Sequence, residues 1–521
     1  MDIWSWMCDL PNSADWPDSN SPLTFQLTPS QHDEKSILLK AERTSGSNTE
    51  TLVTFSICLQ GFNNSNSQYK TTLWVSDTCS LSSSNKPFLP LLMQLLQEII
   101  SRSPIAYNST CPRSQFPKLK PEPISWIIDS HSPESFSSFF NLVFLCRLFW
   151  LCVCDSHFEV GELYFNTLLA PNFNLLSCGH VVRNFLISMG IDAELCFMRT
   201  IGYMVAKWLM LRNMGVGLQL LTPLQSYGFS YAMESHGFWI LKGFAPILSM
   251  TPTRFDKKLG QGRVLEAKES VLRYVLAHQQ LEAVIQLEYS VCFYDNFIQV
   301  NARVENLRFH VVKLGFNNND DGEYTNETYF PSRIRVWVGP EVGAAYVAGL
   351  SLSRSTENPD KEMENQKVVK GNFGKTKAPV LKAKTRTSVR TMTRNWRWEQ
   401  DVDGNAVIFE AILHDDVNGS EVATWKPTSG GNPKNGLKKR YTGGSRVFNK
   451  TGGLVLAGDE YGEWVSWRVS KEMEGSVLKW RLGGKVWLSY FPNDVKSNYF
   501  ETRCVDWCQE VDLPLIQGKQ I

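Results

Sequence analysis

In the segment LEAVIQLEYSVCFY, which begins at Leu281, apolar positions alternate with other residues from Ile285 to Phe293. This period of two predicts a half-buried β-strand. Asp295-Asn296 follows as a two-residue turn signal, and FIQVNARVENL then continues the alternation. The pattern therefore predicts a hairpin formed by residues 287–294 and 297–304.

The turn also fixes which residues of this hairpin lie opposite each other. Centred on Asp295-Asn296, it pairs Phe293 with Ile298 on the apolar face. On the polar face it pairs Glu288 with Arg303, an opposite-charge pair that a shift of one residue would lose. We expect Glu288 and Arg303 to be in contact.

The segment SVLKWRLGGKVWLSYF predicts a second hairpin, because Gly483-Gly484 can supply the positive φ angles of a tight turn. Such a turn would place Trp480 directly opposite Trp487. Further strand-like runs occupy residues 334–338, 345–352, 406–413 and 453–457. Residues 281–512 are therefore expected to form a β-rich domain, an antiparallel sandwich or barrel of roughly eight to ten strands.

The preceding residues have a different pattern. Residues 1–120 mix strand-like runs at 52–59 and 71–76 with a helix-like run at 89–101, which is typical of an α+β region. Residues 121–280 contain long apolar stretches with few charges and are expected to be mainly helical and interior. The predicted fold class is α+β, with a helical central region and a C-terminal antiparallel β-sandwich or barrel.

The run FFNLVFLCRLFWLCVC, residues 139–154, is the one segment apolar enough to suggest a membrane helix. It has 16 residues and contains Asn141 and Arg147, whereas a membrane span needs about 20 mostly apolar residues. We therefore interpret it as a buried core helix and expect no membrane span.

A strongly basic segment interrupts the β-rich region. Residues 367–397 contain ten Lys or Arg and no Asp or Glu. The first half of this segment lacks strong periodicity, so we expect an exposed basic loop that becomes a strand near Thr391. Its cations and the adjoining tryptophans are the candidate ligand-binding or partner-binding residues, namely Lys375, Lys377, Lys382, Lys384, Arg386, Trp396 and Trp398.

The charge balance suggests what such a loop could bind. The whole chain has a net charge of +1, but without the ten loop cations 43 basic residues face 52 acidic ones. Neutralisation of the loop by an acidic patch of the same chain, or by an acidic protein partner, is therefore the preferred interpretation. Trp396 and Trp398 could stack on bases, which keeps nucleic acid as a less favoured alternative beside an idle solvated loop.

No catalytic constellation emerges from residue spacing. GNFGKTK at 371–377 lacks the first glycine of a phosphate-binding loop, since position 369 is valine. Cys152 and Cys154 are separated by one residue in helix-like sequence, so one helix face cannot present both to a metal. The eight histidines occur singly, and the tryptophans of the C-terminal third are either core residues or platforms for sugar rings. Catalytic residues stay unknown, and no metal or cofactor is expected.

The N-terminal segment MDIWSWMCDLPNSADW is acidic and lacks the features of a secretory or transit peptide. We therefore expect a soluble cytoplasmic protein whose cysteines are free thiols.

Five long segments carry a resemblance to a known group of proteins. They are WSWMCDLPNSADW, WIIDSHSPESFSSFFNLVFLCRLFWLC, GPEVGAAYVAGLSLSRSTEN, GDEYGEWVSWRVSKEMEGSVLKWRLGGKVWLSYFPN and ETRCVDWCQEVDLPLI. Together they resemble a family of uncharacterised land-plant proteins with no assigned activity. The resemblance implies an intracellular plant protein and supplies no site residues. The function expected from the sequence is a non-catalytic binding or interaction protein; the alternative is an enzyme acting on a carbohydrate or small metabolite in a cleft between the helical and β-rich parts.

Overall fold

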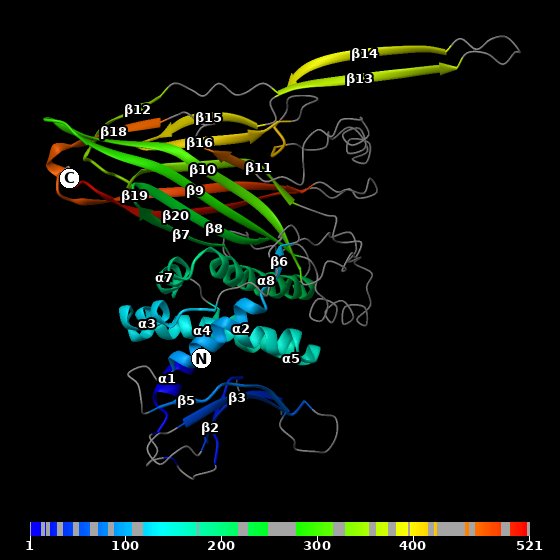
Figure 1. Cartoon of the computed structure of the whole chain (residues 1–521), viewed down its shortest axis with the longest axis vertical. Helices are drawn as coiled ribbons and strands as arrows, with labels where there is room; N and C mark the ends of the chain where they lie inside the picture. Colours follow the sequence, from blue (N-terminus) through cyan, green and yellow to red (C-terminus); the bar gives the residue numbers. More distant parts are fainter. Residues whose placement is uncertain are drawn as a thin grey trace, which may run out of the picture. The chain divides into compact units, whose positions relative to one another are not determined.

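We analysed a computed structural model of the 521-residue chain (Figure 1). The structure describes residues 2–11, 16, 21–28, 35–44, 52–62, 71–81, 88–106, 118–173, 177–216, 228–247, 278–315, 329–353, 361–372, 382–393, 396–414, 421–424, 454–457, 464–490 and 501–517. The fold is α+β, with helices and several antiparallel sheets, as predicted.

The chain divides into two compact units, each assembled from separate stretches of sequence. Unit 1 comprises residues 1–222, 244–280 and 312–325, and unit 2 comprises residues 223–243, 281–311 and 326–521. The sequence predicted three contiguous ranges, 1–120, 121–280 and 281–512. In the structure, the divisions near residues 244, 281 and 312 each fall within a strand, so the chain passes from one unit to the other inside that strand.

Unit 1 begins with an antiparallel sheet. Its strands pair in the order β1-β2-β3-β4, and β5 pairs with β3. The strands are β1 (Leu23–Gln26), β2 (Ser36–Thr44), β3 (Leu52–Gln60), β4 (Thr71–Val75) and β5 (Cys79–Ser80). The predicted runs at 52–59 and 71–76 are confirmed as β3 and β4 to within one residue.

The helices of unit 1 are mostly buried. They are α1 (Ile3–Cys8), α2 (Leu89–Ser101), α3 (Pro121–Ser130), α4 (Pro133–Phe149), α5 (Phe158–Leu163), α6 (Ala170–Asn172), α7 (Gly179–Met189) and α8 (Ile191–Val216), with π-helical turns at Trp150–Cys154 and Tyr164–Leu169. Ser132 begins α4 by accepting a hydrogen bond from the backbone N–H of Ser135.

The apolar helix that suggested a membrane span runs from Pro133 through Cys154, 22 residues with a mean hydropathy of 1.8. It is long and apolar enough to cross a membrane, but 89% of its most apolar window is buried inside the protein. The helix contains one cation, Arg147, whose Nε lies 2.5 Å from Oε2 of Glu98 in α2. The same oxygen of Glu98 accepts a hydrogen bond of 3.0 Å from Trp74 Nε1. A paired charge of this kind is typical of a core helix.

Two antiparallel sheets dominate the β-rich part (Figure 1). Sheet B pairs in the order β12-β18-β10-β9-β8-β7, with β6 and β17 also paired to β10, and sheet C in the order β15-β16-β11-β19-β20. Sheet B contains β6 (Ile105–Ala106), β7 (Phe229–Ser235), β8 (Phe238–Ile247), β9 (His278–Phe293), β10 (Phe297–Gly315), β12 (Val347–Leu352), β17 (Leu454–Ala457) and β18 (Trp464–Ser470). Sheet C contains β11 (Tyr329–Pro340), β15 (Trp396–Asp403), β16 (Ala406–Leu413), β19 (Val477–Tyr490) and β20 (Glu501–Pro514).

The β9–β10 hairpin is confirmed. The backbone N–H of Tyr294 donates to the carbonyl of Phe297, which is the predicted closure of the turn. Arg303 Nη2 donates to Glu288 Oε2 over 2.7 Å, so the predicted cross-strand pair is formed.

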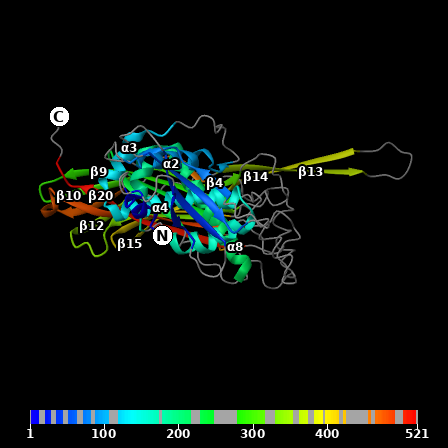
Figure 2. The same cartoon turned by 90° about the horizontal axis from the view of Figure 1, so that it is seen from below.

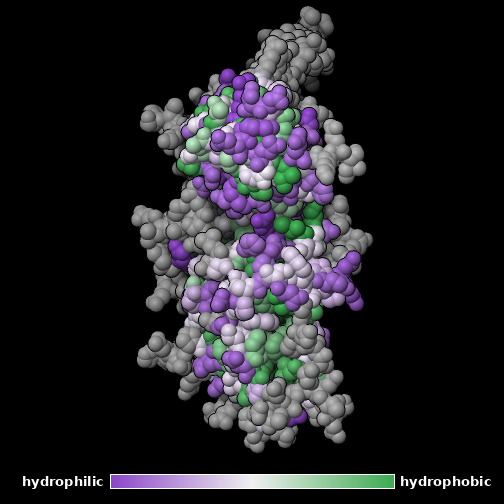
Figure 3. Space-filling view, turned by 90° about the vertical axis from the view of Figure 1, so that its left-hand side faces the viewer, coloured by the Kyte–Doolittle hydropathy of each residue, from purple (hydrophilic) through white to green (hydrophobic). Residues whose placement is uncertain are grey.

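Sheets B and C pack face to face through a column of aromatic rings. The Trp480 ring of β19 stacks 5.8 Å from Trp239 of β8 and meets Trp467 of β18 edge-on at 5.3 Å. Trp239 in turn stacks 4.5 Å from Tyr289 of β9. All three tryptophans are fully buried, so they are core residues of a sandwich and not ligand platforms. On the side seen in Figure 3, hydrophilic residues dominate the top of the view, with smaller hydrophobic groups among them.

Two segments differ in secondary structure from their surroundings in the sequence prediction. Residues 229–247 lie in the range expected to be mainly helical and form the hairpin of β7 and β8, whose turn places His236 and Gly237 at positive φ. Residues expected to form a basic loop are strands β13 (Lys361–Asn372) and β14 (Lys382–Thr393), which pair with each other and with no other described strand (Figure 2). The alternating Thr and Val residues of β14 have high β-propensity, which the concentration of charge obscured.

Candidate functional site

Strand β11 separates two kinds of side chain onto the two faces of sheet C. Ile334, Val336 and Val338 are buried in the sandwich, and the alternating residues Arg333, Arg335 and Trp337 are only partly buried. Opposite residues of an antiparallel ladder share a face. The neighbouring strands therefore add Glu410, Lys485 and Trp487 to the outer face of sheet C, beside Arg335 and Arg333.

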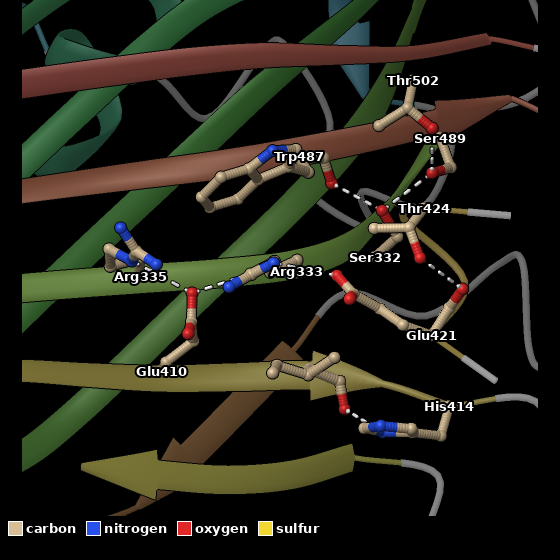
Figure 4. Close-up of polar contacts among 11 residues, drawn as sticks. Ser332, Arg333, Arg335, Glu410, His414, Glu421, Thr424, Trp487, Ser489 and Thr502 are labelled. Carbon is tan, nitrogen blue, oxygen red and sulfur yellow. Dashed lines mark hydrogen bonds and ion pairs between the residues drawn. The ribbon is translucent and has the colours of Figure 1, made fainter. Parts of the chain in front are cut away.

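The centre of the outer face is an ion cluster (Figure 4). Glu410 Oε1 accepts hydrogen bonds from Arg333 Nε (2.7 Å) and Arg335 Nε (3.0 Å), and Arg333 Nη1 donates to Glu421 Oε1 (3.1 Å). Burial alone would raise the pKa of Glu410, but the bonds from the two arginines outweigh it and hold that pKa below its usual value. The hydrogen bond to Glu410 likewise raises the pKa of Arg333. Glu410 and Arg333 are therefore both ionised at neutral pH.

Three cations surround the ring of Trp487 in the same cluster. The distances to the ring centroid are 5.0 Å from Arg333, 5.8 Å from Arg335 and 5.3 Å from Lys485. These are cation–π distances. Trp487 therefore serves to hold the arginines in place, and its ring is occupied by protein groups.

A cavity of about 660 Å³ lies next to the ion cluster, entirely within unit 2. Its lining includes the half-buried ring of Trp337 together with three cations and three acids: Arg335, Arg481, Lys485, Glu341, Asp403 and Asp506. Arg481 Nε donates to the carbonyl of Pro340, which fixes its position. Within the described part of the chain, the carboxylates of Asp403 and Asp506 accept no hydrogen bond and form no ion pair.

Gly483 explains how the ring of Trp337 lies against the sheet. A Cβ atom at residue 483 would be 2.0 Å from the Trp337 ring, so the ring rests directly on glycine backbone. On the opposite face, a Cβ atom at residue 484 would be 2.7 Å from Ile285.

The two glycines therefore form no turn, and the predicted second hairpin is wrong. Strand β19 runs straight through Gly483-Gly484 and pairs along its length with β11 and β20. Trp480 lies opposite Val511, and Trp487 lies opposite Cys504. Gly483 is needed for close packing of the Trp337 ring and Gly484 for close packing of Ile285, and neither glycine adopts a positive φ.

The candidate binding residues predicted from sequence do not come together in one site. Lys375 and Lys377 lie outside the described residues. Lys382, Lys384 and Arg386 occupy alternate positions of β14. Trp396 and Trp398 belong to β15 of sheet C, where they pair with Leu413 and Ala411, so they are in a different sheet from the lysines.

The other sequence candidates are ordinary structural residues. In the part of the chain that is described, no group of three or more His, Cys, Asp or Glu could hold a metal. Burial raises the pKa of the Cys178 thiol to about 12 and also raises the pKa of the Cys152 thiol, so both are protonated at neutral pH. The cysteines that the structure describes are free thiols. His236 is exposed in the β7–β8 turn.

Sequence reasoning missed the cavity. The alternation of RIRVWV at 333–338 is the one signal that could have indicated a charged outer face. Asp403, Asp506 and Gly483 come from strands more than 60 residues away, and only the fold brings them beside Trp337.

No protein-family model and no curated protein matches this chain. Among solved structures, similarity is found to Clostridium perfringens delta-toxin, with 9% identity and a TM-score of 0.21 over 56% of this chain and 89% of the toxin. The membrane-inserted form of the Clostridium perfringens NetB toxin gives 10% identity and a TM-score of 0.18, covering 54% and 94% of the two chains. A structure described as a pore forming protein gives 10% identity and a TM-score of 0.17, and the match covers 55% of this chain and 89% of that protein. TM-scores this low assign neither fold nor function.

Proposed function

We propose that this chain is a non-catalytic binding protein that holds a neutral, polyhydroxylated ligand such as a sugar in the outer-face cavity of sheet C. The observation that carries the proposal is the composition of the cavity lining: one aromatic ring beside balanced cations and acids. A volume of about 660 Å³ falls in the usual range of small-molecule sites.

The balance of charge argues for a neutral ligand. A phosphate or carboxylate would be attracted by Arg335, Arg481 and Lys485 but would also meet the acids Asp403 and Asp506. A hydroxyl group both donates and accepts, so it can bond to a carboxylate and a guanidinium at once. Several neighbouring hydroxyls would satisfy both charge types of this lining.

Trp337 supplies the apolar component of recognition. Sugar rings have C–H-rich faces that can pack on an aromatic ring, and a ring already fixed against Gly483 loses little conformational freedom on binding. Trp487, in contrast, is covered by cations.

We expect the full chain to bind neutral sugars on a glycan array. Calorimetry then measures the affinity for the sugars that bind best. Trp337→Ala should weaken binding at least tenfold, a loss of about 1.4 kcal/mol. Gly483→Ala should also weaken it, because the new methyl group displaces the Trp337 ring, whereas Gly349→Ala, where a Cβ meets no atom within 4 Å, should not.

Trp464→Ala serves as the matched tryptophan control, because Trp464 is 46% exposed and does not line the cavity. Absence of binding to every sugar, or equal loss in the Trp337 and Trp464 variants, would contradict the proposal. Cleavage of the bound sugar would instead favour the enzyme alternative.

An acidic protein partner for the β13–β14 hairpin is a second candidate function, favoured by the strand register. Lys384 pairs directly with Lys370, and like charges opposite each other destabilise a ladder unless an anion is near. Lys382 and Arg386 flank Lys384 at alternating positions.

We expect replacement of Lys382, Lys384 and Arg386 by Gln to abolish binding of a poly-glutamate peptide, measured by fluorescence anisotropy over a salt series. The matched control replaces Thr385 and Thr387 by Ser. Salt-sensitive binding of a mixed single-stranded oligonucleotide that is abolished by the same three changes, without peptide binding, would favour nucleic acid instead.

A further inference from the structure

Two histidines from different helices of unit 1 converge on one atom. His131 is the residue that ends α3, and His180 lies in the first turn of α7. Their ring centroids are 5.5 Å apart with an angle of 71° between the ring planes. Asn184 Nδ2 lies 3.1 Å from His131 Nε2 and 3.5 Å from His180 Nδ1.

The spacing on α7 is suited to chelation. His180 and Asn184 are four residues apart, so they share one face of the helix, and His131 approaches that face from α3. His180 is exposed and the other two residues are half-buried, so an ion has access from solvent.

The hydrogen-bonding geometry of the cluster also suits a metal ion. An amide NH₂ group is only a donor, so the two ring nitrogens that face Asn184 Nδ2 present lone pairs to the same point.

We propose that His131, His180 and Asn184 form a binding site for a divalent transition metal ion, with zinc as the ion tested. The ion would lie between the two ring nitrogens that now face Asn184 Nδ2, and the Asn184 side chain would withdraw from that point and turn Oδ1 toward the ion as the third ligand. Zinc–nitrogen bonds are about 2.0–2.1 Å long, so the His131 ring has to approach the centre by roughly 1 Å and the His180 ring by roughly 1.5 Å. Water completes the tetrahedron.

The site would connect two helices. His131 caps the end of α3 and the other two ligands lie in α7, and these helices are separated by α4, α5 and α6 in the sequence. A bound ion stabilises the folded state because the unfolded chain does not hold the ligands together.

The test uses the full chain, stripped of metal with a chelator. Calorimetric titration with zinc chloride should show one site, and zinc should raise the thermal unfolding temperature. His131→Ala and His180→Ala should each weaken zinc binding at least tenfold and remove the thermal shift. Asn184→Asp should bind more tightly than the wild type, since a carboxylate replaces the amide oxygen, an outcome that a purely structural role for Asn184 does not produce.

His157→Ala is the matched control, because His157 is exposed and stands apart at the start of α5. The exposed thiols of Cys8, Cys154 and Cys508 are the competing ligands. Cobalt distinguishes them, because thiolate ligation gives a charge-transfer absorption that a histidine site lacks. Unchanged zinc affinity in both histidine variants, or cobalt spectra of thiolate type, would overturn the proposal.

Discussion

Replacing Trp480 with alanine is expected to lower the free energy of unfolding of the β-rich unit by about 3–5 kcal/mol, the usual cost of removing a large aromatic side chain from a core. The Trp480 ring is fully buried and contacts Trp239 and Trp467, so its loss leaves a cavity between sheets B and C. Denaturant unfolding, followed by circular dichroism, measures the change.

Trp464→Ala provides the comparison on the same sandwich. Trp464 is 46% exposed, and its replacement should cost under about 1 kcal/mol. If the two variants lost equal stability, the assignment of Trp480 to a packed core would be wrong.

Glu410→Gln is expected to cost about 2–3 kcal/mol at neutral pH. The change keeps the shape of the side chain but removes the charge that faces Arg333 and Arg335. Breaking a fully buried pair costs about 3–5 kcal/mol, and the partial exposure of the two arginines reduces that figure. Thermal or denaturant unfolding of both proteins gives the difference.

The pH dependence of the same variant is a stricter test. Because the folded pKa of Glu410 lies below its usual value of 4.5, its contribution is fully present above pH 4.5 and is lost as the pH falls through the folded pKa. The stability curves of wild type and Glu410→Gln should therefore converge in acid. Glu399→Gln, which breaks an exposed pair with Arg397, should change stability by less than about 0.5 kcal/mol at any pH. Parallel curves down to strongly acidic pH would contradict the role assigned to Glu410.

Local patterns predicted the parts of the fold in which periodicity and turn chemistry agree. The β9–β10 hairpin was predictable to the side-chain pair, because alternation, Asp295-Asn296 and the Glu288–Arg303 pairing all require one register. The helix at 89–101 and the strand at 406–413 were predicted at their observed bounds from their apolar patterns.

Prediction failed where a residue serves a distant neighbour. Gly483-Gly484 has the local signature of a turn, and only the positions of Trp337 and Ile285, from two other strands, make those glycines part of a straight strand. The cavity was beyond sequence for the same reason, since Asp403, Arg481 and Asp506 belong to three different strands. The basic segment was predicted to be a loop because its many charges drew more weight than the β-propensity of its threonines, and its second half is the strand β14.

At Gly483-Gly484, sheet C is reduced to bare backbone on both sides. Trp337 rests on one side and Ile285 on the other, with no side chain of β19 between them. A displacement of the outer ring is therefore transmitted to the sandwich core across a single peptide layer. Trp507 stands next to that point, 3.9 Å from where a Cβ atom of residue 484 would lie. Only backbone separates the two faces of sheet C at this place. A ligand bound on the outer face should therefore alter the packing, and hence the fluorescence, of tryptophans on the inner face.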